Sequence, residues 1–342
     1  MKKKHLLVGT ALIATAGLLL TGCSTSGGNN PDANGDEQGS GETRTIRISH
    51  VNPPTSIDGQ IVEEVAAAIQ ERTNGELVME VFPSGQIGTT GDTAEQVANG
   101  EDLIAYMDAG TIGQMGATDF SLLGGPFLFD GNDEVNNFLG SEFFAEMSDQ
   151  VAAEQGIRVL SLGWTDGPRH IFANQPVPHP DDLAGIKLRT PPIDTWLTTF
   201  DLLGAVPTEV ANTETYSALE QGVVDAAEGP INGTYPQRWQ EVATHVTLTG
   251  HFQTLIGYGI SEALWQSLTE EQQQIISEEF IAGGERAQEQ YAGEIESTMA
   301  LMEEESGVEF HEADSDAYRE RTAPFYEGNE ELYQQVREAA QG

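Results

Sequence analysis

The sequence has few basic side chains and a single cysteine. Its 342 residues contain 15 lysines and arginines against 55 aspartates and glutamates, which gives a formal net charge of −40. So acidic a chain is not expected to bind nucleic acid or an anionic membrane surface directly. Cys23 is the only cysteine, which excludes an internal disulfide framework. Lys187 is the only lysine beyond residue 22, so the surface is expected to be rich in acids and poor in lysine. Such a surface suits a protein exposed to a salty exterior, and a solvated charge excess without a specific role is the alternative.

Motifs of catalysis and metal binding are also missing. The chain contains no G-x-S-x-G nucleophile elbow, no HExxH, no CxxC and no P-loop. The seven histidines are scattered without the i, i+4 spacing of metal ligands on a helix, and the glycines of 110–116 do not have the spacing of a dinucleotide fingerprint. The sequence therefore predicts a protein that is not an enzyme, with no cofactor and no metal.

The N-terminus has the pattern of a targeting segment. Lys2 to Lys4 precede an apolar stretch from Leu6 to Leu20, and the tetrapeptide LTGC ends at Cys23. This tetrapeptide resembles a bacterial lipobox, so we expect residues 1–22 to be a lipoprotein signal peptide and Cys23 to carry the lipid. An ordinary secretory signal followed by an incidental cysteine is the alternative. Residues 23–43 are acidic and rich in glycine, which predicts a flexible tether from the membrane to a folded body outside the cytoplasm.

Hydrophobic periodicity predicts alternating strands and helices over the rest of the chain. The first series places strands at 45–50, 76–82 and 103–108 and helices at 58–74 and about 93–99, an order typical of a parallel α/β sheet. A second series has strands at 157–164, 169–174, 185–190 and 223–228 and helices at about 194–203 and 213–222.

A helix much longer than the others follows the second series. Thr269 and Gln272 form a capping box at its start, Gly283-Gly284 interrupt its pattern, and Gly307 ends it. A helix of this length without heptads or a membrane-spanning composition suggests an element that braces two lobes.

Two arginines stand where predicted strands meet loops. Arg169 opens the strand at 169–174 behind Gly167-Pro168, and Arg189 ends the strand at 185–190 before Pro191. Small ligands bind at strand ends in open α/β sheets, and an arginine is costly to bury without an anionic partner. A bidentate carboxylate satisfies its guanidinium group well. Taken alone, however, each arginine in so acidic a chain is better explained by an ion pair with an Asp or Glu.

Several separate blocks resemble one known family. VFPSGQIG at 81–88 is similar to a signature of the substrate-binding proteins of tripartite ATP-independent periplasmic (TRAP) transporters, and the likeness continues through GGPFLFDGNDE, GWTDGPRHIFAN, DDLAGIKLRTPP, LGAVPTE, TYSALEQGVVDAAEGP and LTGHF. The resemblance implies an α/β, two-lobed, periplasmic-binding-protein-like (type II-like) fold, with hinge strands and a long C-terminal helix spanning both lobes. The first lobe would comprise 44–166 plus about 255–294, and the second 167–254 plus about 295–342.

The resemblance also implies ligand-binding residues. Arg189 would make a two-pronged salt bridge to the carboxylate of a small-molecule solute, Arg169 would add a second polar contact, and Asp108 and Asn52 would face the cleft.

The chain departs from the family pattern at two places. Asn212 stands where the family often has an aromatic residue, and Glu228-Gly229-Pro230 replaces a Glu-Asn-Pro motif, which suggests a wider or differently polar pocket. Trp164 and Phe252 are candidates for aromatic contacts, although ordinary core packing explains each better.

The function implied is that of a lipid-anchored, monomeric solute receptor. It would deliver a carboxylate-containing solute to the small and large integral membrane subunits of a TRAP permease. An ABC importer or a sensor kinase as the partner is the first alternative, and a surface enzyme acting on an organic acid is the second. Sugar acids, oxo acids, dicarboxylates, aromatic acids and zwitterions all remain open as solutes.

Overall fold

Two mixed β-sheets organise residues 43–342, the part of the chain that this computed structural model describes. The first sheet has the order β2-β1-β3-β10-β4. Its strands are β1 (Arg44–Ser49), β2 (Leu77–Phe82), β3 (Leu103–Asp108), β4 (Ile157–Ser161) and β10 (Ile256–Ser261). β1 runs parallel to β2 and β3, as predicted, whereas β10 is antiparallel to both β3 and β4. The predicted signal peptide, Cys23 and nearly all of the tether lie outside the described residues.

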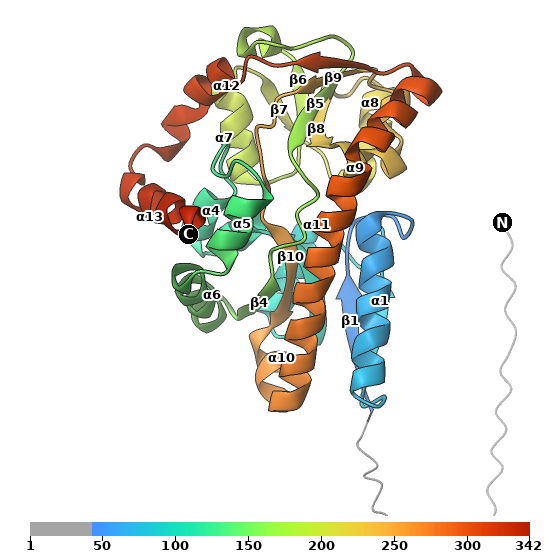
Figure 1. Cartoon of the computed structure of the whole chain (residues 1–342), viewed down its shortest axis with the longest axis vertical. Helices are drawn as coiled ribbons and strands as arrows, with labels where there is room; N and C mark the ends of the chain where they lie inside the picture. The colour runs from blue at the N-terminus through green and yellow to red at the C-terminus, as the bar shows by residue number, and fades with distance from the viewer. Residues whose placement is uncertain (1–42) are drawn as a thin grey trace, which may run out of the picture. The chain divides into compact units, whose positions relative to one another are not determined.

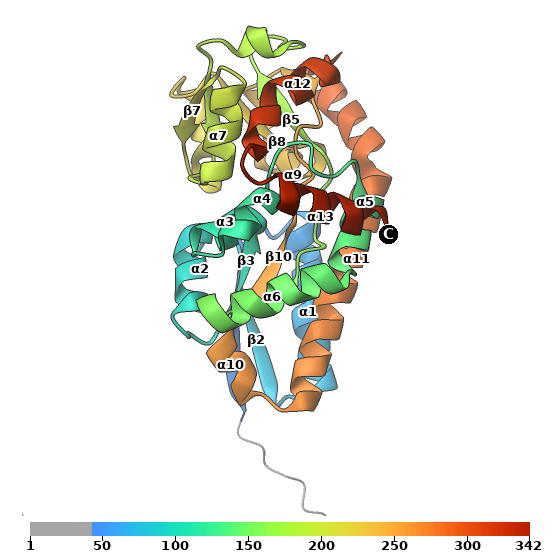
Figure 2. The ribbon, with the colours of Figure 1, turned by 90° about the vertical axis from the view of Figure 1, so that its left-hand side faces the viewer.

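The second sheet has the order β11-β9-β5-β8-β6-β7. Its strands are β5 (Arg169–Ala173), β6 (Lys187–Thr190), β7 (Val206–Glu209), β8 (Ala226–Pro230), β9 (His245–Leu248) and β11 (Glu309–Glu312). β5 lies antiparallel between β8 and β9, so this sheet is mixed as well. The chain passes from the first sheet to the second between β4 and β5 and returns between β9 and β10 (Figures 1 and 2).

Helices cover both faces of the first sheet. Along β3, Ile104 and Tyr106 belong to a core shared with α1 (Ile57–Arg72), while Leu103 and Met107 belong to a core on the opposite face. That second core includes α2 (Thr90–Ala98), α3 (Ala109–Gln114), α4 (Thr118–Leu123), α5 (Asn132–Leu139) and α6 (Glu142–Gln155). Alternate side chains of β3 thus enter the cores on the two faces of the sheet, and for this reason all six of its residues are buried.

Shorter helices flank the second sheet. They are α7 (Asp194–Leu202), α8 (Thr215–Glu220), α9 (Ile231–Thr234) and α12 (Ser315–Thr322), and α10 (Glu262–Ser267) follows β10 of the first sheet. None of the helices between residues 43 and 342 has the length and apolar composition needed to cross a membrane.

The long helix α11 (Glu270–Ser306) contacts elements of both sheets, as predicted. It packs on α1 and β4 of the first and on α9 beside the second, and it runs along the length of the folded body in Figure 1. The capping box of Thr269 and Gln272 is present, and Gly307 ends the helix with a positive φ of 66°. Gly283 and Gly284 do not interrupt it.

Three features differ from the sequence prediction. The strand expected at 223–228 begins three residues later, at Ala226, because Gly222 has φ 67° and its turn includes the valines that follow. The strands β7, β9, β10 and β11 were not predicted. The C-terminal helix α13 (Glu330–Gln341), placed in the second lobe by the predicted boundaries, packs instead on α5 with Val336 and Ala340 in the core of the first sheet. The strands of each sheet do fall within the ranges predicted for each lobe, and the lobe boundaries themselves stay a prediction.

Candidate functional site

A cavity lies where residues from the ends of both sheets meet. Its walls include Asn52, Asp108, Asp166, Arg169, Arg189 and Asn212. The volume is about 180 Å³, far more than the ~10–15 Å³ that one water needs, so the cavity is large enough for a small organic molecule. Five residues predicted to bind ligand, Asn52, Asp108, Arg169, Arg189 and Asn212, are therefore brought to one cavity.

Arg189 is the arginine whose charge is not paired. It is only 2% exposed, and its Nε donates a hydrogen bond of 2.9 Å to the carbonyl oxygen of Val210. Every other arginine of the described chain has a carboxylate oxygen within 4.0 Å, but Arg189 has none. Burial lowers the pKa of Arg189 to about 10, against the opposing influence of Glu228. A cation is thus held at the cavity wall without a counter-ion from the protein.

Arg169 also lines the cavity, but it is paired. Its Nε and Nη2 donate to the two carboxylate oxygens of Glu228 at 2.6 and 2.9 Å. Trp196 Nε1 donates to the same carboxylate at 3.0 Å, and His251 Nε2 lies 3.5 Å from it. Burial opposes the charged form of both partners, yet their attraction raises the pKa of Arg169 and lowers that of Glu228. The ion-pair interpretation is therefore right for Arg169 in this structure, and its contact with a solute stays a prediction.

Asp108 and Asn52 reach the cavity from the first sheet. Asp108 ends β3 and caps α3, because its two carboxylate oxygens accept hydrogen bonds of 2.9 Å from the backbone N–H and the hydroxyl of Thr111. Burial raises the pKa of Asp108, although these two bonds oppose the shift. Asn52 follows β1 and donates a hydrogen bond of 2.8 Å to Asp58. Both side chains are thus fixed by neighbours before a solute arrives.

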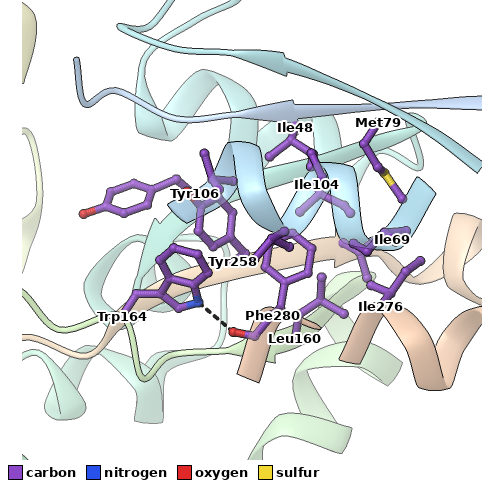
Figure 3. Close-up of a cluster of buried hydrophobic side chains, with 14 of the residues drawn as sticks. Ile48, Ile69, Met79, Ile104, Tyr106, Leu160, Trp164, Tyr258, Ile276 and Phe280 are labelled. Atoms are coloured by element: carbon purple, nitrogen blue, oxygen red, sulfur yellow. Dashed lines mark hydrogen bonds between the residues drawn. The ribbon is translucent and has the colours of Figure 1, made fainter. Parts of the chain in front are cut away.

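Four residues predicted to contact ligand do not line this cavity. Glu228 is fully buried behind Arg169. Trp164 is also fully buried, and its Nε1 donates to the carbonyl of Phe280 at 2.9 Å within the core (Figure 3). Phe252 packs against Trp196 with ring centroids 4.8 Å apart. At Gly229 an added Cβ would lie 2.6 Å from Thr234 Cγ2, so this glycine is required by packing. The core interpretation of the two aromatic residues therefore holds.

Other cavity residues were missed by the sequence analysis. Trp196, Tyr106, Tyr291 and Asp166 all line the cavity, and Asp58 lies directly behind Asn52. Burial raises the pKa of Asp166 to about 6 and, together with the charge of Asp166, that of Asp58 to about 8. Asp58 stands in the first turn of α1, where an acid is ordinarily explained by the helix dipole, so its sequence position gives no sign of a site.

Comparison with known proteins agrees with this arrangement. The family model described as bacterial extracellular solute-binding protein, family 7 (DctP) matches residues 48–338. The C4-dicarboxylate-binding periplasmic protein DctP of Rhodobacter capsulatus is 26% identical over 273 residues, which cover 79% of this chain and 81% of that protein.

Solved structures show the same fold. A TRAP periplasmic solute-binding protein from Fusobacterium nucleatum, with bound sn-glycerol-3-phosphate, is 31% identical with a TM-score of 0.84 over 87% of this chain and 97% of that one. Another from Chromohalobacter salexigens, with bound D-glucuronate, is 26% identical with a TM-score of 0.80 over 86% and 99%. The chain belongs to family 7 of the bacterial extracellular solute-binding proteins, the DctP family of TRAP transporter substrate-binding proteins.

Proposed function

We propose that the solute of this TRAP receptor is an organic acid and that Arg189 binds its carboxylate. The observation that carries the proposal is the missing counter-ion of Arg189, a buried cation at the wall of a cavity. Burying a charge costs free energy unless the charge is paired, and a carboxylate matches the two-pronged geometry of a guanidinium group. The bound solute would supply the negative charge that the protein does not.

The charge balance favours a carboxylate over a phosphate. A guanidinium group binds either anion, and the relatives bind both kinds: glycerol phosphate in the Fusobacterium protein, glucuronate in the Chromohalobacter protein. A phosphate monoester carries about −1.5 to −2 charges at neutral pH, whereas a carboxylate carries one. Arg169 is already paired with Glu228, so Arg189 is the arginine of the cavity wall that is free to pair with the solute, and its single positive charge matches the single negative charge of a carboxylate.

Delivery and anchoring complete the proposal. A lipid on Cys23 would hold the receptor at the outer face of the membrane, and residues 23–43 would let its folded body reach the permease. The receptor would act as a monomer that presents the bound acid to the small and large integral membrane subunits.

A thermal-shift screen tests the solute class. Purified receptor would be heated with organic acids, with their amides or alcohols, and with phosphate monoesters. We expect one or more carboxylates to raise the melting temperature and their uncharged analogues to have no effect, because only a ligand that binds the folded state stabilises it. Stabilisation by phosphate monoesters alone would contradict the carboxylate assignment, and stabilisation by uncharged solutes alone would contradict the role of Arg189.

A further inference from the structure

The cavity wall contains acidic groups as well as Arg189. Arg189 comes from β6 of the second sheet, whereas Asp58 belongs to α1 on the first, and Asp166 lies in the segment between β4 and β5. Asp166 is 8% exposed and lines the cavity. Asp58 is 1% exposed and lies behind Asn52, from which it accepts a hydrogen bond. The two acids and Asn52 therefore form a polar region that is separate in the fold from the strand of Arg189.

This polar region contains oxygen atoms without hydrogen-bond partners. Oδ1 of Asp166 and Oδ1 of Asp58 are buried and unpaired, and so is the hydroxyl of Thr254, another residue of the cavity wall. Buried polar atoms in folded proteins are nearly always hydrogen-bonded, and each unpaired one costs about 1–3 kcal/mol. Asp166 faces a cavity with room for a ligand, so a ligand can supply the missing donor.

The charges around Asp166 limit what that donor can be. Burial favours the protonated form of Asp166, and Glu228 adds to this effect while Arg169 opposes it. Burial and the nearby charge of Asp166 favour the protonated form of Asp58 even more strongly. An ionised carboxylate on the solute has no hydrogen to donate to the unpaired oxygen, whereas a hydroxyl or ammonium group would donate to it.

We infer that the solute carries hydrogen-bond donors, hydroxyl or ammonium groups, on the part remote from its carboxylate, and that Asp166 accepts a hydrogen bond from them. This inference rests on the proposed function, because it takes Arg189 as the partner of the carboxylate. It excludes simple aliphatic acids and dicarboxylates as preferred solutes, since both leave the unpaired oxygen of Asp166 without a hydrogen-bond donor.

Calorimetric titration with matched acids tests the inference. Three groups of six-carbon acids would be compared: hexanoate and adipate, a set of aldonates and uronates, and 6-aminohexanoate with lysine. We expect the best donor-bearing acid to bind about 100-fold or more tightly than hexanoate, because a site built to hydrogen-bond strongly rejects an analogue that lacks the group. Preference for a hydroxylated or an aminated acid identifies which donor is used.

A variant and a control complete this test. Asp166→Asn keeps the shape of the side chain, and we expect it to reduce the preference over hexanoate by at least tenfold, while the exposed Asp316→Asn leaves it unchanged. Equal binding of hexanoate or adipate to the wild type would overturn the inference and leave the proposed function intact. Binding of no acid, together with binding of uncharged solutes, would overturn the proposed function itself.

A second, independent cluster lies at the edge of the second sheet, away from the cavity residues. β9 and β11 run parallel with His245 opposite Glu309, and His311 lies two residues further along β11. His245 Nδ1 is 3.0 Å from His311 Nε2 and 3.8 Å from Glu309 Oε2. No local sequence pattern indicates this cluster, because the two histidines lie 66 positions apart in the chain.

The spacing of these three atoms fits the ligands of one metal ion. Zinc is bound by histidine nitrogen at ~2.0–2.1 Å and by carboxylate oxygen at ~2.0–2.2 Å in a tetrahedral arrangement, which places ligand atoms roughly 3.3 Å apart. All three candidate atoms lie within 4.8 Å of one another, and both histidines are partly exposed. An ion can therefore enter from solvent with only small movements of the side chains.

The geometry points to a divalent transition-metal site, with zinc as the fitting ion, formed by His245, Glu309 and His311. Three protein ligands leave the fourth position to water. The ion would link β9 to β11, the edge strand that follows α11. Both histidine rings, which now contact each other directly, would then bind the same ion.

Metal titration of tag-free protein tests this site. We expect one equivalent of ZnCl₂ to bind with a dissociation constant in the micromolar range or below, CoCl₂ to give the visible absorption of tetrahedral cobalt, and His245→Ala or His311→Ala to lose at least tenfold in affinity. His179→Ala removes a partly exposed histidine elsewhere and should leave the zinc affinity unchanged. Absence of zinc binding, or binding retained in the His245/His311 double variant, would overturn the proposal.

Discussion

Single residues show how one cavity contains two arginines of different kinds. Arg169 and Arg189 occupy similar places at strand ends, and the sequence alone favours an ion pair for both. The structure gives a partner to Arg169 and none to Arg189. The difference depends on which acid folding brings near, and Glu228 lies on β8, 59 residues after Arg169 in the chain. No local pattern specifies such a pairing, whereas the family resemblance does distinguish the two arginines.

Replacing Arg189 by methionine should stabilise the ligand-free protein. The substitution removes a buried charge without a counter-ion and keeps an unbranched apolar chain in its place. We expect the free energy of unfolding to rise by roughly 0.5–2 kcal/mol, as is common when a functional site is optimised for stability. Urea denaturation measures this change, and a loss of stability would show that Arg189 is compensated within the protein.

Replacing Glu228 by glutamine should lower the free energy of unfolding. It leaves Arg169 buried without a carboxylate, and breaking a buried pair costs roughly 3–5 kcal/mol. The matched control is Glu101→Gln, because Glu101 pairs with Arg47 at the solvent-accessible surface. For this control we expect the free energy of unfolding to fall by at most about 1 kcal/mol. Denaturant unfolding compares the two, and equal losses would contradict a structural role for the Arg169–Glu228 pair.

Asp58 should make stability decrease as the pH rises. Its pKa is about 8 in the folded protein, against ~3.9 when unfolded. Between these values the folded state keeps a proton that the unfolded state has released, so each rise in pH favours unfolding. We expect the free energy of unfolding of the wild type to fall relative to Asp58→Asn between about pH 5 and pH 8. Parallel pH profiles for the two proteins would show that Asp58 does not titrate in this way.

Individual elements explain which parts of the fold were predictable. Strong local signals such as the capping box of Thr269 and Gln272 gave the start of α11 correctly. β10 was missed because its sequence IGYGIS contains two glycines and lacks a clear alternation, yet its pairing with β3 and β4 fixes it as a strand. Its Gly257 would place a Cβ 1.9 Å from the carbonyl oxygen of Ser161, so the glycine that weakens the local signal is required by packing.

Two glycines of α11 provide a matched test of helix packing. At Gly283 an added Cβ would lie 2.6 Å from Trp164 Cζ2, whereas at Gly293 nothing lies within 4 Å. Gly293→Ala should therefore stabilise the protein by up to about 1 kcal/mol through helix propensity. Gly283→Ala gains the same propensity but displaces a fully buried tryptophan, so we expect a net loss of about 1–3 kcal/mol. Thermal or urea unfolding measures both, and equal effects would contradict the close contact of α11 with Trp164.

The whole molecule carries a large excess of negative charge. A formal net charge of −40 repels itself in the compact state, and salt screens that repulsion over a Debye length of ~10 Å at 0.1 M. We expect the melting temperature to rise as NaCl increases from low to near-molar concentration. A melting temperature that falls or stays constant would show that the surface ion pairs outweigh the repulsion.

Binding at Arg189 is the central claim, and calorimetric titration of Arg189→Met tests it most directly. The titrant is the acid that most stabilises the wild type in the thermal-shift screen, and the variant is first shown to be folded. Loss of the buried charge pair should cost on the order of 2–5 kcal/mol, which weakens binding roughly 30-fold to several thousand-fold. A folded Arg189→Met protein that binds the same acid with the dissociation constant of the wild type would contradict the account.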